Sequence, residues 1–172
     1  MGDHSRTCYH EAGHAILFWV LSEFPPDRVL VHSDGTGKVE ITRAMNHGFR
    51  LPVEKNAMVA AAGRAAELRL DSPECMSWTD DDRHQEILWL LQEDGHLSDA
   101  SDYAVVNSVH RRRQVILKST ALVDKYWDRI ERLAQALREL TLQGEFTTVS
   151  MEWQEILTVL MADLAGPDAT FP

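Results

Sequence analysis

The sequence predicts a mainly α-helical (α+β) domain, in which one small β-hairpin accompanies several helices. Apolar residues recur at helical spacing along much of the 172-residue chain. β-Branched residues gather around a glycine-containing turn within residues 28–43. Apolar residues make up 44% and charged residues 26% of the chain, as in an ordinary globular protein. We therefore expect residues 1–172 to form a single domain, with 5–95 as its first half and 100–165 as a C-terminal helical part.

The first half is predicted to begin with a helix and a hairpin. The helix runs from residue 5 or 7 to about residue 22, because two prolines follow at 25 and 26. The hairpin occupies about 28–43, since its two β-branched runs flank a turn with two glycines. Residues 45–52 have no regular pattern.

Two further helices are predicted in the first half. The one at about 53–70 has a centre made almost entirely of small residues, so its backbone can approach a neighbour closely, and we expect that neighbour to be the first helix. After a loop at 71–78, Thr79 is suited to cap the next helix, and Asp82 can complete a capping box. This helix should end near residues 94 and 95.

The C-terminal part is predicted to consist mainly of helices. A polar loop at 96–102 leads into a long amphipathic stretch at 103–142, where apolar residues recur at helical spacing. A glycine-containing break follows at 143–145. The last helix is expected at 150–164.

The net charge and the cysteine content restrict the partners and the compartment. A formal net charge of −10 disfavours nucleic acid and anionic membrane surfaces, because both attract basic patches. The basic cluster at 110–113 is interpreted as a solvated turn of helix. Cys8 and Cys75 are too few for a disulfide framework, so we expect reduced thiols and a cytoplasmic protein. The first nine residues are polar, so no leader is expected. The apolar run at 15–21 is shorter than the ~20 residues that cross a bilayer, so no membrane anchor is expected either.

The most informative stretch of the sequence is Tyr9-His10-Glu11-Ala12-Gly13-His14-Ala15. On a helix, His10 and His14 lie on one face about one turn apart, so both imidazoles can reach one ion. Glu11 lies beside them, where it can take a proton from a metal-bound water, as in the H-E-x-x-H motif of metallopeptidases. The alternative is an amphipathic helix that carries two histidines by chance. The small residues around the histidines favour a buried helix, and buried histidines need partners such as a metal ion.

A catalytic zinc site normally uses three protein ligands, so a third ligand must come from elsewhere in the chain. The candidates are Glu67, the cluster Asp80-Asp81-Asp82, His84 and His32.

The motifs resemble the peptidase domain of the FtsH family of zinc metalloproteases. The matching segments are Tyr-His-Glu-Ala-Gly-His-Ala at 9–15, Ala-Gly-Arg-Ala-Ala-Glu at 62–67, Pro-Glu at 73–74 with the acidic helix start that follows, and apolar positions within 115–145. The resemblance covers most of residues 5–157. It implies a helical zinc-metallopeptidase domain with a small sheet beside the helix that carries the histidines.

The resemblance also implies where the third ligand lies. In that family, an aspartate at the start of the helix after the Ala-Gly-Arg-Ala-Ala-Glu block binds the zinc, which here means Asp80, Asp81 or Asp82. Asp80 lies on the apolar face of a continuous helix and is preferred. Loop length favours Asp82 instead, so Asp82 is kept as the alternative and Asp81 comes third. His84, one turn after Asp80, is either a partner of the site or a surface histidine.

The sequence departs from the family in having no Walker-type phosphate loop, whereas FtsH proteins carry a membrane anchor and an AAA+ ATPase before the peptidase domain. We therefore predict a stand-alone, ATP-independent zinc endopeptidase that cleaves peptides or unfolded protein segments. One Zn²⁺ ion is expected on His10, His14 and either Asp80 or Asp82, with Glu11 as the general base.

Two alternatives remain beside the peptidase. One is a non-proteolytic metal-binding scaffold that acts as a protein-interaction module. The other is a helical domain without a metal. Formation of a homo-oligomer is left open.

Overall fold

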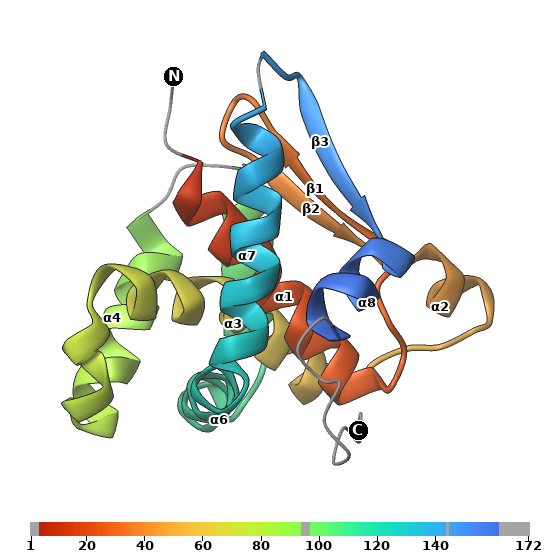
Figure 1. The fold of residues 1–172 in the computed structure, drawn as a ribbon. Helices are drawn as coiled ribbons and strands as arrows, with labels where there is room; N and C mark the ends of the chain where they lie inside the picture. Colours follow the sequence, from red (N-terminus) through yellow and green to blue (C-terminus); the bar gives the residue numbers. More distant parts are fainter. Residues whose placement is uncertain (1–3, 94–96, 144, 162–172) are drawn as a thin grey trace.

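A computed structural model of the chain describes residues 4–93, 97–143 and 145–161. The protein is mainly helical, and a small three-stranded antiparallel sheet lies at one side of the helices (Figure 1). This confirms the predicted mainly α (α+β) fold class.

Helices and three short strands follow one another along the chain. In order they are α1 (Ser5–Ser22), β1 (Arg28–His32), β2 (Gly37–Glu40), α2 (Thr42–Asn46), α3 (Val53–Asp71), the 3-10 helix η1 (Pro73–Ser77), α4 (Asp80–Glu93), α5 (Leu97–Asn107), α6 (Arg112–Lys125), α7 (Trp127–Thr141), β3 (Thr148–Glu152) and α8 (Trp153–Met161).

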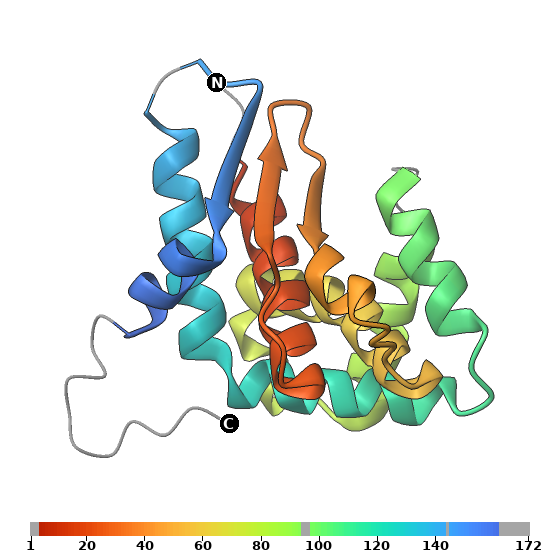
Figure 2. The same ribbon diagram turned by 90° about the vertical axis from the view of Figure 1, so that its right-hand side faces the viewer.

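Helix α1 lies at the centre of the molecule. It packs against α3 and α7, and strands β1 and β2 lie across it (Figure 2). Its contact with α3 is close because most residues between Ala57 and Ala66 are small and buried. The predicted packing of these two helices is therefore confirmed. On the side of α7, the ring of Tyr9 stacks on that of Trp127, with ring centroids 5.5 Å apart.

The sheet has the strand order β2-β1-β3, and both pairings are antiparallel. The predicted hairpin is present, with Arg28 opposite Glu40 and Val31 opposite Gly37. It is shorter than 28–43, because the chain turns into α2 at Thr42. Among the described residues, strand β2 pairs with β1 alone, so its other side is an edge of the sheet.

The C-terminal part contains a strand that the sequence analysis missed. The last helix was expected at 150–164, but Thr148–Glu152 forms β3, with Val29 opposite Met151. The physical reason is its pairing with β1, which buries Met151 while both of its neighbours stay exposed. Helix α8 follows, and the ring of Trp153 packs edge to face against the ring of Trp19 of α1. The part of the expected helix after residue 161 lies outside the described residues.

The middle of the chain also differs from expectation. Residues 97–102 of the predicted polar loop belong to helix α5, because that helix buries Val106 and packs on α3. The amphipathic stretch at 103–142 is not one helix but the end of α5, then α6 and α7, with Tyr126 alone between the last two. The described part of the predicted break at 143–145 lies between α7 and β3.

One smaller prediction, the capping box of α4, is confirmed. The hydroxyl of Thr79 hydrogen-bonds to the carboxylate of Asp82, whose backbone N–H in turn donates to that hydroxyl, so the capping box of α4 forms. Cys8 and Cys75 are buried and form no disulfide. Among the described residues, no helix has both the length and the apolar character needed to cross a bilayer.

Because α1 and α3 approach closely at Gly13, a larger side chain at this position should lower the stability of the protein. A β-carbon at this position would lie 2.7 Å from the carbonyl oxygen of Ala62, so the backbone of α3 would have to move. Gly13→Val should lower the free energy of unfolding by about 1–3 kcal/mol, as measured by urea denaturation. Ala121→Val, at an exposed position of α6, is the control and should have little effect. Equal stability of the two variants would contradict the close packing of α1 on α3.

Candidate metal centre

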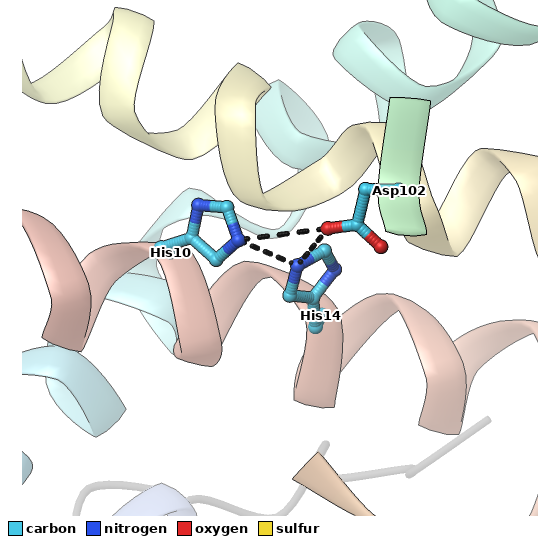
Figure 3. Close-up of side chains that lie close together, drawn as sticks. All are labelled: His10, His14 and Asp102. Carbon is cyan, nitrogen blue, oxygen red and sulfur yellow. Dashed lines mark hydrogen bonds and ion pairs between the residues drawn. The ribbon is translucent and has the colours of Figure 1, made fainter. Parts of the chain in front are cut away.

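Two histidines of α1 and one aspartate of α5 meet in a partly buried group. The Nε2 atoms of His10 and His14 lie 2.8 Å apart. The Oδ2 atom of Asp102 lies 3.0 Å from Nε2 of His14 and 3.7 Å from Nε2 of His10 (Figure 3). Each residue thus offers one ligand atom, and all three atoms lie within 4.8 Å of one another. Among the described residues, no other group of histidine, cysteine or acidic side chains converges in this way.

The other nitrogen of each ring is held by helix α3. Nδ1 of His10 lies 2.6 Å from Oε1 of Glu67, and Nδ1 of His14 lies 2.7 Å from the carbonyl oxygen of Val59. A carboxylate and a carbonyl only accept hydrogen bonds, so we infer that both Nδ1 atoms carry protons and donate. In the neutral rings, both Nε2 atoms therefore turn their lone pairs toward each other and toward Asp102.

This donor set requires a positive charge at the point where the atoms meet. Two imidazole lone pairs and a carboxylate oxygen repel one another at these distances unless a proton or a metal ion lies between them. Hydrogen bonding of the outer ring nitrogen to a carboxylate or a carbonyl is also the usual support of a metal-binding histidine. The group is therefore suited to hold a metal ion.

The pKa shifts have the same physical cause. Burial opposes a charge on His10, but the carboxylates of Asp102 and Glu67 outweigh it and raise the pKa of His10 to about 10. The pKa of His14 is also raised, because the charge of Asp102 overcomes the effect of burial. Conversely, burial favours protonation of Asp102, yet the adjacent His14 and His10 hold its pKa well below its usual range. The site attracts cations strongly.

Glu67 supports the site and is not positioned as a ligand. Its Oε1 atom binds Nδ1 of His10, on the ring side opposite the converging atoms, and its Oε2 atom accepts hydrogen bonds from Arg64 at 2.6 Å and Arg6 at 3.1 Å. Burial alone would raise the pKa of Glu67, but His10 and the two arginines lower it, so the carboxylate stays ionised. Glu67, a third-ligand candidate in the sequence, therefore orients His10.

The ring of His10 lies against the backbone of α3 at Gly63. A β-carbon at this position would come within 2.6 Å of the imidazole. The glycine therefore lets the ring reach Glu67 on one side and Asp102 on the other. The Ala-Gly-Arg-Ala-Ala-Glu segment thus supplies both the space for His10 and its hydrogen-bond acceptor.

Glu11 lies between the histidines and the sheet. It is only 5% exposed, and its side chain lies so close to Gly37 of β2 that a β-carbon there would fall 2.4 Å from its Cγ. Glu11 lines a cavity of about 290 Å³ together with His10, His14 and Asp102. The rest of the wall is formed by the sheet edge, by Ile41, by apolar side chains of α1, α3 and α5, and by the polar Asn56 and Ser101. The predicted ligands His10 and His14 and the predicted base Glu11 are thus brought together.

The third ligand predicted from the sequence is corrected. Asp80 and Asp82, and with them Asp81, lie at the exposed start of α4 and are not part of the group. Asp82 caps the helix through Thr79, and Asp81 pairs with Arg113 at 2.6 Å. Their place is explained by helix capping and by the favourable effect of acidic residues in a first helical turn.

The two other histidine candidates also lie elsewhere. Nδ1 of His32 hydrogen-bonds to the hydroxyl of Thr148 on β3. His84 belongs to α4 and lines a different cavity.

The sequence does not place Asp102 in the site, because the polar composition of residues 96–102 predicts a loop. A signal was present in the sequence, since Val105 and Val106 follow Asp102 at helical spacings of three and four. An acidic residue on the apolar face of a helix is expensive to bury without a partner, and this marks it as a candidate ligand.

Neither a protein-family model nor a curated protein matches the chain. The function therefore has to be inferred from the site itself.

The geometry predicts that Asp102, and neither Asp80 nor Asp82, contributes to metal affinity. Asp102→Asn keeps the shape of the side chain but removes the charge, so zinc affinity should fall by more than the ~10–100-fold typical of losing an outer hydrogen-bond partner. Asp80→Asn and Asp82→Asn should bind zinc as the unmodified protein does. Competition with a chromophoric chelator measures the affinities. A loss in Asp80→Asn or Asp82→Asn equal to that in Asp102→Asn would refute this assignment.

The raised histidine pKa values predict that metal binding releases protons. Below a pKa of about 10, His10 of the metal-free protein holds a proton that a metal ion must displace. Metal affinity should therefore rise with pH across the neutral range and level off as pH passes that pKa. Calorimetry at one pH in two buffers of different ionisation enthalpy counts the protons released. A binding enthalpy that does not depend on the buffer would contradict this prediction.

Proposed function

We propose that the protein is a zinc-dependent, ATP-independent endopeptidase that hydrolyses peptides or unfolded protein segments. One observation carries the proposal: a buried glutamate, Glu11, lines the same surface cavity as three converging ligand side chains. Three protein ligands beside an accessible cavity are the arrangement of catalytic rather than structural zinc sites. The motif resemblance to the FtsH family supports the same conclusion.

His10, His14 and Asp102 would hold the zinc ion. Two imidazoles and one carboxylate are a common catalytic zinc ligand set. When bound, zinc supplies a Lewis acid that polarises a peptide carbonyl and makes water more acidic. Glu67 and the carbonyl of Val59 keep the two rings in the tautomer that leaves Nε2 available.

Glu11 is the group that moves the proton. In the hydrolysis we propose, its carboxylate accepts a proton from the attacking water and then gives it to the amine that leaves as the peptide bond breaks. The close contact with Gly37 restricts the side chain of Glu11 on the cavity wall. Since the residue is almost completely buried, its carboxylate is shielded from bulk water, which strengthens its interaction with developing charge.

The cavity is suited to an extended peptide. Strand β2 contributes Gly37, Lys38 and Val39 to its wall, and the unpaired side of β2 offers backbone groups for hydrogen bonding with a substrate strand. Phe18 and Val105 form part of an apolar wall that can receive a substrate side chain. A volume of about 290 Å³ suits a few residues rather than a folded chain, which is why we propose peptides and unfolded segments as substrates.

The substitution Glu11→Gln tests this function. It keeps the size of the side chain but removes the base, so cleavage of casein or of a peptide library should fall by roughly 10²–10⁴-fold. Zinc content, measured by elemental analysis, should be unchanged. The zinc chelator 1,10-phenanthroline should abolish the activity of the unmodified protein, and added zinc should restore it.

Glu54→Gln, at an exposed position of α3, serves as the control and should cleave normally. Unchanged cleavage by Glu11→Gln would overturn the assignment of the base. A zinc-loaded, folded protein that cleaves no substrate would instead favour the non-proteolytic scaffold.

A further inference from the structure

A second cavity, of about 410 Å³, lies where α4, the end of α5 and the start of α6 meet. Its wall is formed by His84 of α4, Asn107 at the end of α5, and residues 109–114. In Figure 2, the connection from α5 to α6 is found at the lower right. The cavity shares no lining residue with the metal centre, so its chemistry needs a separate explanation.

The wall carries a strong positive charge in a protein of net charge −10. Arg111, Arg112 and Arg113 all line the cavity. The guanidinium of Arg113 pairs with the exposed Asp81, and that of Arg112 donates to the side-chain oxygen of Asn107 at 2.5 Å. Among the described residues, no ion pair neutralises Arg111 or Arg112. The cluster therefore retains most of its charge and attracts an anion.

The start of α6 adds hydrogen-bond donors to the same wall. The helix begins at Arg112 and has 14 residues, and its N-cap residue Arg111 makes no side-chain cap. The first N–H groups of a helix have no acceptor within the helix, and its dipole favours negative charge there. Arg112, Arg113 and Gln114 all line the cavity. Helix starts of this kind bind phosphate and other anions.

A buried imidazole gives independent evidence for a ligand. His84 is 8% exposed, and its Nε2 atom has no hydrogen-bond partner among the described residues. Burial, together with Arg113 and Arg112, lowers the pKa of His84, so the ring is neutral at pH 7 and keeps one N–H to donate. A buried imidazole nitrogen without a hydrogen-bond partner is unfavourable, and a ligand bound in the cavity that His84 lines can supply one.

We propose that this cavity is a binding site for phosphate, either as the free anion or as a small phosphate monoester. Guanidinium groups match the oxygens of phosphate in geometry and charge, and the start of α6 and His84 add neutral donors. The overall charge of −10 disfavours a long nucleic acid on the same site, because the rest of the surface repels it. The basic cluster at 110–113 thus becomes part of a binding site instead of a solvated turn of helix.

The test titrates the full-length, ¹⁵N-labelled protein with inorganic phosphate at constant ionic strength. The backbone amides of Arg112, Arg113 and Gln114 should shift and saturate at millimolar phosphate. A second titration with phosphoserine separates the two sources: tighter binding than inorganic phosphate indicates a monoester, and equal binding indicates the free anion. Either result supports the site.

Three variants identify the residues responsible. Arg111→Gln and His84→Phe should each weaken phosphate binding, by about tenfold for the loss of a hydrogen bond to a charged ligand. Lys118→Gln removes one charge from an exposed position further along α6 and should bind normally. Circular dichroism verifies the fold of each variant. If His84→Phe fails to fold, His84→Gln replaces it.

Three results would overturn the proposal. The first is the absence of a saturable shift at residues 112–114 of the unmodified protein. The second is an equal loss in Lys118→Gln and Arg111→Gln, which would indicate a diffuse charge effect. The third is full affinity in the folded His84 variant. Because phosphate can also contact a bound metal, only shifts at residues 112–114 count as binding at this site.

Discussion

The structure of this protein depends on the convergence of two imidazole lone pairs and one carboxylate within a partly buried space. Three electron-rich groups at such distances are unfavourable unless a cation balances them. The surrounding helices are arranged so that this convergence is enforced. Helix α1 provides His10 and His14, α3 holds the outer nitrogens of their rings, and α5 brings Asp102 from the opposite side. A proton or a metal ion between these groups makes the arrangement favourable.

Small residues allow the helices to come close enough to bring these groups together. The helices α1 and α3 approach closely because alanines and glycines fill their interface. At Gly63, the ring of His10 occupies the space that a side chain would otherwise fill. The same closeness brings the carboxylate of Glu67 to the ring of His10 and the arginines to Glu67. Packing and chemistry are therefore not separable here, because any side chain that pushed α3 away from α1 would also release the histidines.

The two cavities are lined by charged groups of different kinds. The first collects carboxylates and imidazoles around a place for a cation, and the sheet edge forms part of its wall. The second collects guanidinium groups and helix N–H groups around a place for an anion. Helix α5 connects them, since Asp102 lies on it and Asn107 ends it. The basic cavity contrasts with the net charge of −10 of the whole chain.

The sequence by itself determined the features whose partners are close in the chain. The spacing of His10 and His14, the place of Glu11 beside them, the hairpin and the capping box of α4 all follow from local rules of helices and turns. The third ligand was decided only by tertiary structure. Asp102 reaches the histidines because α5 packs across α3. Its position on the apolar face of a helix is a local signal, but the sequence pattern places Asp80 on such a face as well, so the pattern alone does not choose between them. Strand β3 was likewise decided by β1, because a strand of five residues gains its hydrogen bonds from a neighbour far away in the sequence.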